Sequence, residues 1–437
     1  MTSQPDQYLP LHSIHFFNDF KLEEGQKNIF ENIISWKTSP PLVKTGRSTY
    51  LLVKDTDVPF QGVKIKGCGF FDVHNNTVMQ PSTEDGYDAH IQQAPDGIKE
   101  VHYQIEVNEH DEPMYTIPKK RPYGAQFFEN AKLEFDTTKE LFDRWNDKKE
   151  AFPFYYPIGY ARYKKLFYND KPLGVTILGI PGEKETALGK YFVGNFEDKG
   201  LRINPYIVKY WQQHCAPAGK ESPDYFDLLA TLKQLCFEFG KTLSHLHKHY
   251  VDHDSHLFNA MVNLEHGNVI LFDLDHVYNV SELSAQKSFY YMLKDLEIGL
   301  VAIISNFLLN GIVEGVVLFE KLNQPIDDYN LIEGFFAGYF GEDNEVAKQD
   351  AKNIWNRMLT FSLNTLLNTP RKDHFHVAYD FCEKERKKSY IDAYRYLKNI
   401  VAKQHEKSLT LTPEKHATIM TNLFAQRLTL QHTDPKQ

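Results

Sequence analysis

Short apolar runs that are separated by turn residues in the first half of the chain predict antiparallel strands. Short β-like runs cover Thr49–Lys54 and Gly62–Lys66, and the loop between them is rich in Asp and Pro, which favours a hairpin. Two further β-like runs cover Tyr160–Phe167 and Leu173–Ile180. The pair Pro181-Gly182 follows the last run and marks the end of this part of the chain.

In other segments apolar residues recur every three or four positions, which is typical of helices. One such segment, Tyr123–Lys148, lies between the two pairs of β-like runs, and an earlier one covers Glu23–Trp36. Beyond the Pro-Gly pair we expect long helices at Tyr225–Tyr250 and Ser288–Leu309, and further helices to about Gln426. A β-rich first part and a helical second part predict an α+β protein with two lobes and a cleft between them.

This order of elements divides the chain into three parts. We expect an extension at residues 1–40, a β-rich lobe at 41–182 and a helical lobe at 183–437. The polar stretch 72–122 is expected to be an insertion in the first lobe, with a strand at Val101–Val107. The lobe boundary therefore falls where the strand pattern gives way to the helical one.

Composition narrows the class of protein. Hydrophobic residues make up 42% of the 437 residues and charged residues 24%, which is typical of a folded globular chain. The formal net charge of −9 argues against general nucleic-acid binding. The four cysteines are far apart and form no C-x-x-C motif, so we expect a reducing, cytoplasmic location. We expect no secretory signal, because Met1–Pro10 is polar and lacks an apolar core. We expect no transmembrane segment, because the longest apolar stretch, around Ile298–Leu309, is too short and contains polar residues.

The candidate chemistry is concentrated in the segment Val251–Tyr278. Asp254 begins a polar loop that ends at Asn259, and Asp273 follows the next β-like run. The turn Glu265–Asn268 predicts a hairpin that brings Asn259 and Asp273 to the same end of two strands. Carboxylate and amide oxygens are ligands that suit Mg²⁺. Asp254 is then placed to accept or orient the proton of a hydroxyl group during phosphoryl transfer.

This segment resembles the protein-kinase-like superfamily, and most closely its aminoglycoside and choline phosphotransferases. The resemblance rests on D-S-H-L-F-N at 254–259 and on L-F-D-L-D at 271–275. It implies a bilobal kinase-like fold that binds ATP and Mg²⁺ or Mn²⁺ at the hinge between the lobes. It also implies that Asp252 stands where the family usually has histidine.

The resemblance assigns a role to several residues of the second lobe. Asp254 is the implied catalytic aspartate, and Asp295 is the implied helix aspartate that braces its loop. His256 matches the loop histidine of the small-molecule kinases. The implied metal ligands are Asn259, Asp273 and Asp275.

The first lobe adds candidates for nucleotide binding. V-K-I-K at Val63–Lys66 resembles the strand whose last lysine contacts the nucleotide phosphates. We expect Glu129 of the following helix to hold Lys66, with Glu134 as the second candidate. The loop expected to cover the phosphates contains Gly46, Arg47 and Ser48.

Three functions remain open on these residues. The first is a kinase that moves the γ-phosphoryl group to a hydroxyl of a protein or, slightly less favoured, of a small molecule. The second is AMP transfer to protein, because Gly46-Arg47 and I-K-G-C-G at 65–69 also resemble the selenoprotein-O family. The third is an inactive pseudokinase that serves as a binding module. Atypical kinases of this kind occur among secreted bacterial effectors, so delivery to a host cell also remains open, as does the identity of any activating partner.

Overall fold

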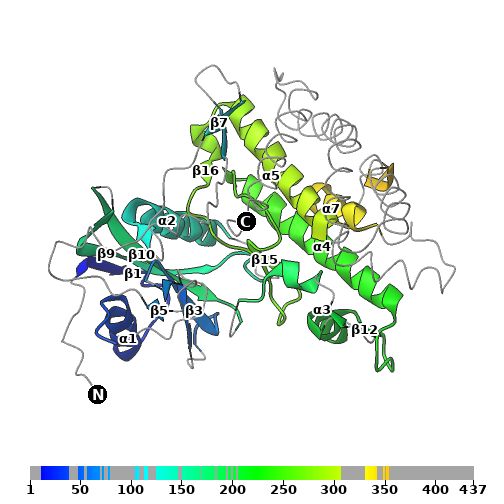
Figure 1. The fold of residues 1–437 in the computed structure, drawn as a ribbon, viewed down its shortest axis with the longest axis horizontal. Helices are drawn as coiled ribbons and strands as arrows, with labels where there is room; N and C mark the ends of the chain where they lie inside the picture. Colours follow the sequence, from blue (N-terminus) through cyan, green and yellow to red (C-terminus); the bar gives the residue numbers. More distant parts are fainter. Residues whose placement is uncertain are drawn as a thin grey trace, which may run out of the picture.

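A six-stranded antiparallel sheet and the helices that follow it form the framework of the molecule (Figure 1). The structure, a computed structural model, describes residues 11–38, 48–53, 57–68, 71–72, 77–78, 104–107, 113–116, 125–145, 150–168, 170–182, 185–192, 195–197, 200–202, 205–306, 330–341, 348–349 and 351–353. The architecture confirms the predicted α+β class.

The main sheet has the strand order β1-β9-β10-β3-β2, and β8 pairs with β10 beside this path. In the β2–β3 pair Ser48 lies opposite Lys66, and in the β10–β3 pair Thr176 lies opposite the same lysine. The strands are β1 (Leu11–Phe16), β2 (Ser48–Leu52), β3 (Gly62–Lys66), β8 (Gln126–Phe127), β9 (Tyr156–Tyr168) and β10 (Lys171–Ile180). Lys66 therefore lies in the interior of the sheet.

Helices α1 (Glu24–Ile34) and α2 (Phe128–Arg144) cover opposite faces of this sheet. His15 of β1 contacts Phe135 of α2, whereas the next residue, Phe16, contacts Phe30 of α1. Successive residues of a strand point to opposite faces, so the two helices lie on different sides. All five residues of β3 are buried as a result.

The strands and helices expected in the first half agree closely with the structure, which also contains short strands that were not expected, such as β8 at the start of the expected helix. The expected extension at 1–40 includes the helix α1, but it also includes β1, an edge strand of the main sheet. Within the expected insertion, β6 (Gln104–Val107) pairs with β7 (Pro113–Thr116), and β4 (Phe71–Asp72) pairs with β5 (Thr77–Val78). The strand expected at Val101–Val107 is thus found over its second half.

Four α-helices dominate the described part of the second half. α3 (Pro205–Tyr210) continues into a π-helix at Trp211–Cys215, and α4 (Tyr225–His247) follows. The side chains of Asp224 and Asp227 form a capping box at the start of α4. The other two helices are α5 (Ala285–Asn306) and α7 (Leu331–Phe340).

Two short pairs of strands between α4 and α5, one of them a hairpin, join the sheet to the helices. β14 (Ala260–Val262) pairs with β15 (Val269–Leu271), as the turn sequence predicted, and β13 (Tyr250–Val251) pairs with β16 (Tyr278–Asn279). Isolated bridges connect Leu271 to Phe154, which precedes β9, and Met261 to Ala187, which follows β10. One continuous hydrophobic core contains residues of the sheet, the hairpins and the helices.

Some expectations lie outside the described residues. Gly46, Arg47, the helices expected from residue 354 to Gln426 and the cysteine at position 382 belong to this group. None of the helices in the described ranges is long and apolar enough to cross a membrane.

Candidate functional site

The loop between β13 and β14 carries the candidate catalytic aspartate. Asp252 and Asp254 in this loop have positive φ angles of 70° and 59°, and Asp273, after β15, has 69°. Aspartate is one of the few residues besides glycine that adopts this left-handed backbone, and such conformations are concentrated at functional sites. The backbone therefore fixes the direction in which these three carboxylates leave the chain.

Asp295 of α5 holds the loop by its backbone. Its Oδ2 accepts a hydrogen bond from the amide of His253 at 2.9 Å, and its Oδ1 accepts one from the amide of Asp254 at 3.0 Å. Burial opposes ionisation of Asp295, but the hydrogen bond and charge of His247 and the contacts with His253 hold its pKa below the ordinary value. An ionised, buried Asp295 thus braces the loop, which confirms the contact that the resemblance implied.

A second tie joins α5 to the start of the same loop. Lys294 forms a buried ion pair with Asp252. Burial opposes the charged form of Lys294, but Asp252 and the nearby Asp254 and Asp295 raise the pKa of its ammonium. Adjacent residues of one helix, Lys294 and Asp295, therefore anchor the side chain and the backbone of the loop.

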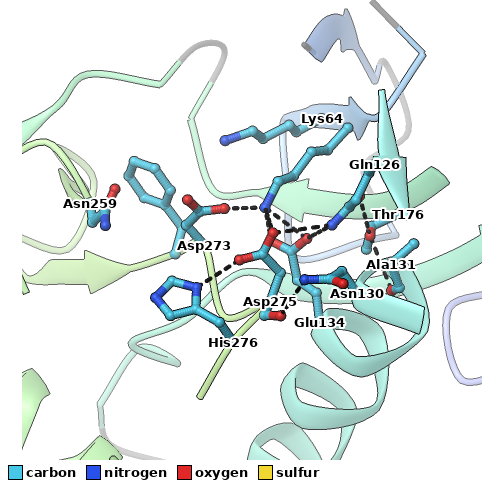
Figure 2. A network of polar contacts seen from close by, with 12 residues as sticks. Lys64, Gln126, Asn130, Ala131, Glu134, Thr176, Asn259, Asp273, Asp275 and His276 are labelled. Atoms are coloured by element: carbon cyan, nitrogen blue, oxygen red, sulfur yellow. Dashed lines mark hydrogen bonds and ion pairs between the residues drawn. The ribbon is translucent and has the colours of Figure 1, made fainter. Parts of the chain in front are cut away.

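Lys66 of β3 contacts three carboxylates from different segments. Figure 2 labels these three residues, Glu134, Asp273 and Asp275. Nζ of Lys66 lies 3.0 Å from Oε2 of Glu134 in α2 and 3.2 Å from Oδ2 of Asp275, and it also donates to Oδ1 of Asp273. Lys66, Glu134 and Asp275 are buried, whereas the Asp273 side chain is 26% exposed. Glu134, Asp273 and Asp275 each offer one oxygen within 4.8 Å of the others. Asp273 is therefore the member of this cluster that faces the outside.

Two neighbours that the sequence did not single out complete the cluster. Gln126 of β8 donates to Oε2 of Glu134 at 3.1 Å and to Oδ2 of Asp275 at 3.5 Å. His276 lies 2.8 Å from Oδ1 of Asp275. Burial opposes the charged form of His276, but the hydrogen bond to Asp275 and the surrounding carboxylates raise its pKa to about 9. With His276 charged, the cluster carries two cations against three carboxylates.

The expectation that Glu129 would hold Lys66 is wrong in this structure. Glu129 is in the first turn of α2, its side chain is 70% exposed, and it pairs with Lys171 at 3.2 Å. Glu134 is five residues further along, on the face that α2 buries against the sheet together with Ala131 and Thr138. Ala131, Glu134 and Thr138 are spaced i, i+3 and i+7, so they share one helix face. This spacing is the sequence signal that favours Glu134 over Glu129.

Asn259 lies at the same end of the hairpin as Asp273, as predicted. The amide of Phe272 donates to the carbonyl oxygen of Asn259 at 3.2 Å, so the two strands are paired at this end. The side-chain amide of Asn259 donates to the carbonyl oxygen of Asp254 at 3.1 Å. Figure 2 shows Asp273 between Asn259 on one side and Asp275 and Glu134 on the other. The carbonyl oxygen of the Asn259 side chain remains the atom suited to a metal ion.

A second charged cluster lies beside the first, on the same strand. Lys64 is two residues before Lys66, and its Nζ lies 2.8 Å from Oε2 of Glu185. The hydroxyls of Tyr155 and Tyr50 donate to the same oxygen at 2.6 and 3.0 Å. Burial opposes the charged form of Lys64, but Glu185 raises the pKa of its ammonium. The cluster ties the segment after β10 to the sheet, and no local sequence signal indicates it.

The remaining candidates lie at the edge of this arrangement. Ser48 is the first residue of β2, directly across from Lys66, and it is buried. Nδ1 of His256 accepts a hydrogen bond from the amide of Phe258 at 3.1 Å, so this histidine shapes the loop. Gly46 and Arg47, which precede Ser48, are outside the described residues.

The donor set at this site suits a small, hard cation. Carboxylate and amide oxygens are the ligands that Mg²⁺ and Mn²⁺ prefer, and the partly exposed Asp273 offers an oxygen with access from outside. The closeness of three carboxyl groups also favours a divalent ion, although burial raises the pKa of one of them, Glu134. Comparison of the chain with protein-family models and with curated proteins finds no match. The functional argument therefore rests on the residues and geometry of the site.

Proposed function

We propose that the chain is an ATP- and Mg²⁺-dependent phosphotransferase with a bilobal protein-kinase-like fold, the sheet and α2 forming the first lobe. The observation that carries the proposal is the contact of Lys66 with Glu134, Asp273 and Asp275. These residues come from a strand, a helix and the segment after a distant hairpin. A lysine for phosphates beside carboxylates for metal is the arrangement that phosphoryl transfer uses.

Asn259, Asp273 and Asp275 would hold the metal in this proposal. Bound Mg²⁺ neutralises charge on the phosphate oxygens and helps to align the γ-phosphoryl group. Lys66 binds the phosphates through its ammonium, and Glu134 keeps this side chain in place from α2. Ser48 lies opposite Lys66 at the start of β2, where the loop with Gly46 and Arg47 would reach the phosphates.

Asp254 acts on the acceptor. Its carboxylate accepts the proton of the acceptor hydroxyl as the hydroxyl oxygen forms a bond to the γ-phosphorus. The bond between this phosphorus and the bridging oxygen breaks, and ADP leaves with the electron pair. Asp295 and Lys294 support the loop in this geometry, since they hold its backbone and the side chain of Asp252. We favour a protein acceptor over a small molecule.

Labelled nucleotide tests this function. The purified chain is incubated with Mg²⁺ or Mn²⁺ and ATP labelled at the α- or the γ-phosphate, with and without a protein extract as acceptor. Protein labelled only by γ-labelled ATP is the expected result, and Asp273→Asn should abolish it. Label retained only from α-labelled ATP means AMP transfer and overturns the proposal. Nucleotide binding without any turnover in either series means an inactive pseudokinase.

A second readout does not depend on turnover. Free Mn²⁺ has a paramagnetic resonance signal that decreases when the ion binds, so binding can be titrated without nucleotide. We expect the wild-type chain to bind Mn²⁺ and Asp273→Asn to bind it at least about tenfold more weakly. Equal binding by the two proteins would contradict the assignment of Asp273 as a metal ligand.

A further inference from the structure

A chain of buried and partly buried hydrogen bonds links helix α7 to the loop that carries Asp254. The hydroxyl of Tyr339 in α7 lies 2.7 Å from Nδ1 of His247, the last residue of α4. Nε2 of His247 lies 3.1 Å from Oδ2 of Asp295 in α5. Asp295 then accepts the amides of His253 and Asp254. Three helices thus contribute one residue each to a connection that ends on the loop backbone.

The chemistry of the groups fixes the direction of the hydrogen bond between His247 and Asp295. Asp295 is ionised and only accepts, so Nε2 of His247 must donate its hydrogen to it. The hydroxyl of Tyr339 both donates and accepts, so it pairs with Nδ1 of a neutral or a charged imidazole. Every polar atom along the chain has a partner in this arrangement. Removal of the Tyr339 hydroxyl would leave Nδ1 of a buried histidine without its partner.

Close packing sets the position of α7 against α4. A Cβ atom on Gly338 would lie 1.9 Å from the carbonyl oxygen of Phe237, and one on Gly240 would lie 2.1 Å from that of Phe335. The backbones of the two helices therefore touch at these glycines. Gly338 is directly before Tyr339 in the sequence. A helix seated this closely has little freedom to slide, so Tyr339 meets His247 in one defined position.

The connection continues past Asp254 to a proposed metal ligand. The carbonyl oxygen of Asp254 accepts the side-chain amide of Asn259 at 3.1 Å. A shift of the Asp254 peptide would therefore move both the proposed base and the amide that faces the metal. The ion pair between Lys294 and Asp252 does not depend on these hydrogen bonds and would remain if they were lost.

We propose that Tyr339 and His247 are positioning residues that hold the loop with Asp254 and Asn259 through Asp295. The importance of this loop for catalysis rests on the proposed function, but its position can be measured without it. The α7 helix thus takes part in the site although it lies on the other side of α4. The position of α7 must therefore be defined as precisely as the position of the loop itself.

Amide hydrogen exchange of the full-length chain tests the positioning. Tyr339→Phe keeps the ring and removes only the hydroxyl, and His247→Leu removes both ring nitrogens. We expect the amides of His253 and Asp254 to exchange about three- to tenfold faster in both variants. His247→Gln should recover most of the protection, because its side-chain amide can still donate to Asp295.

Tyr163→Phe is the matched control. The hydroxyl of Tyr163 is also buried and donates to a backbone oxygen, that of Ile34, at 3.1 Å, but within the sheet and α1. This variant should leave exchange in the loop at the wild-type rate. If Tyr339→Phe exchanges no faster than Tyr163→Phe at the amides of His253 and Asp254, the proposal is wrong.

Turnover provides a separate criterion. In an active chain Tyr339→Phe should lower kcat about three- to tenfold and leave KM for ATP unchanged, since the nucleotide contacts are elsewhere. Faster exchange in a chain that transfers no phosphoryl group supports the positioning role and contradicts the proposed function. Unchanged exchange in an active chain contradicts the positioning role and leaves the proposed function in place.

Discussion

Lys66 and Glu134 form an ion pair with an Nζ–Oε2 distance of 3.0 Å, and their side chains are only 3% and 1% exposed. The pair joins β3 to α2 inside the protein. Burial of charges is unfavourable unless each charge has a close partner. Lys66 has three such partners, whereas the carboxylates share this lysine and His276 as their cations. The lysine is therefore harder to replace than any one of the acids.

Replacement of Lys66 by methionine should be strongly destabilising. The variant leaves three carboxylates close together without their central cation, and we expect the free energy of unfolding to fall by about 3–5 kcal/mol. Lys171→Met is the control, because Lys171 pairs with the exposed Glu129 and its loss should cost less than about 1 kcal/mol. Urea denaturation measures both. Similar losses in the two variants would show that the buried cluster contributes no more than a surface pair.

Magnesium should partly restore the Lys66→Met variant. A divalent ion that binds between the carboxylates replaces the missing charge and stabilises the folded state in proportion to its affinity. We expect 10 mM Mg²⁺ to raise the midpoint of thermal unfolding more in Lys66→Met than in the wild type. An equal or smaller rise in the variant would argue that no cation enters this cluster.

Variants of Asp254 and Asp273 should separate metal binding from chemistry. Asp273→Asn should lose both Mn²⁺ binding and turnover, whereas Asp254→Asn should keep Mn²⁺ binding and lose at least about 100-fold in turnover. Asparagine is the appropriate replacement because it also tolerates the positive φ of these positions. Alanine would add backbone strain to the loss of charge. Loss of Mn²⁺ binding in Asp254→Asn would instead indicate that Asp254 is itself a metal ligand.

The contact between α4 and α7 predicts a contrast between two glycines. Gly338→Ala should lower the free energy of unfolding by at least about 2 kcal/mol, since its Cβ would lie 1.9 Å from a backbone oxygen. Gly25→Ala, in the first turn of α1 with open space around it, should raise stability by up to about 1 kcal/mol. Chemical denaturation at one pH measures both. A neutral Gly338→Ala would mean that α7 can move away from α4.

Glu238 of α4 predicts a dependence of stability on pH. Burial raises the pKa of its carboxyl, although Lys241 and a hydrogen bond from Gln234 act in the opposite direction. A carboxyl with a raised pKa in the folded state favours folding when protonated, so this contribution decreases as the pH rises from the unfolded pKa through the folded one. Glu238→Gln should therefore gain stability relative to the wild type between pH 4 and pH 7.5. A constant difference across this range, measured by urea unfolding, would contradict the shift.

Local patterns were sufficient for most strands and helices, because each element carries its own period. Short β-like runs between turn residues located β3 and β10, and the spacing of apolar residues located α2 and α4. β1 was missed because its partner, β9, is far along the chain and its own six residues are mostly polar or partly exposed. Strand pairing over such a distance leaves no mark in the local sequence.

The site shows the same difference between features that a local pattern indicates and contacts between distant segments. The motif indicated Asp254, Asn259 and Asp273, and the contact between Lys66 and Asp273 agrees with their combination. Two glutamates of one helix were not separated correctly, because the choice depends on which face meets the sheet. Lys64 with Glu185, and Tyr339 with His247, were not predicted at all. These pairs are separated by 121 and 92 positions, and each residue alone has an ordinary sequence context.

The long separation between Lys66 and Asp273, 207 positions, has a consequence for the synthesis of the protein. At about 5–20 residues per second, roughly 10–40 s pass on the ribosome between the two residues. During this interval the first strands and α2 can already assemble, with Glu134 as the only carboxylate of the cluster yet made. At this stage Lys66 can already pair with Glu134, and the two aspartates join the pair later. The apolar residues of the sheet that belong to the common core with α4 and α5 are therefore without these partners until the second half of the chain has been made.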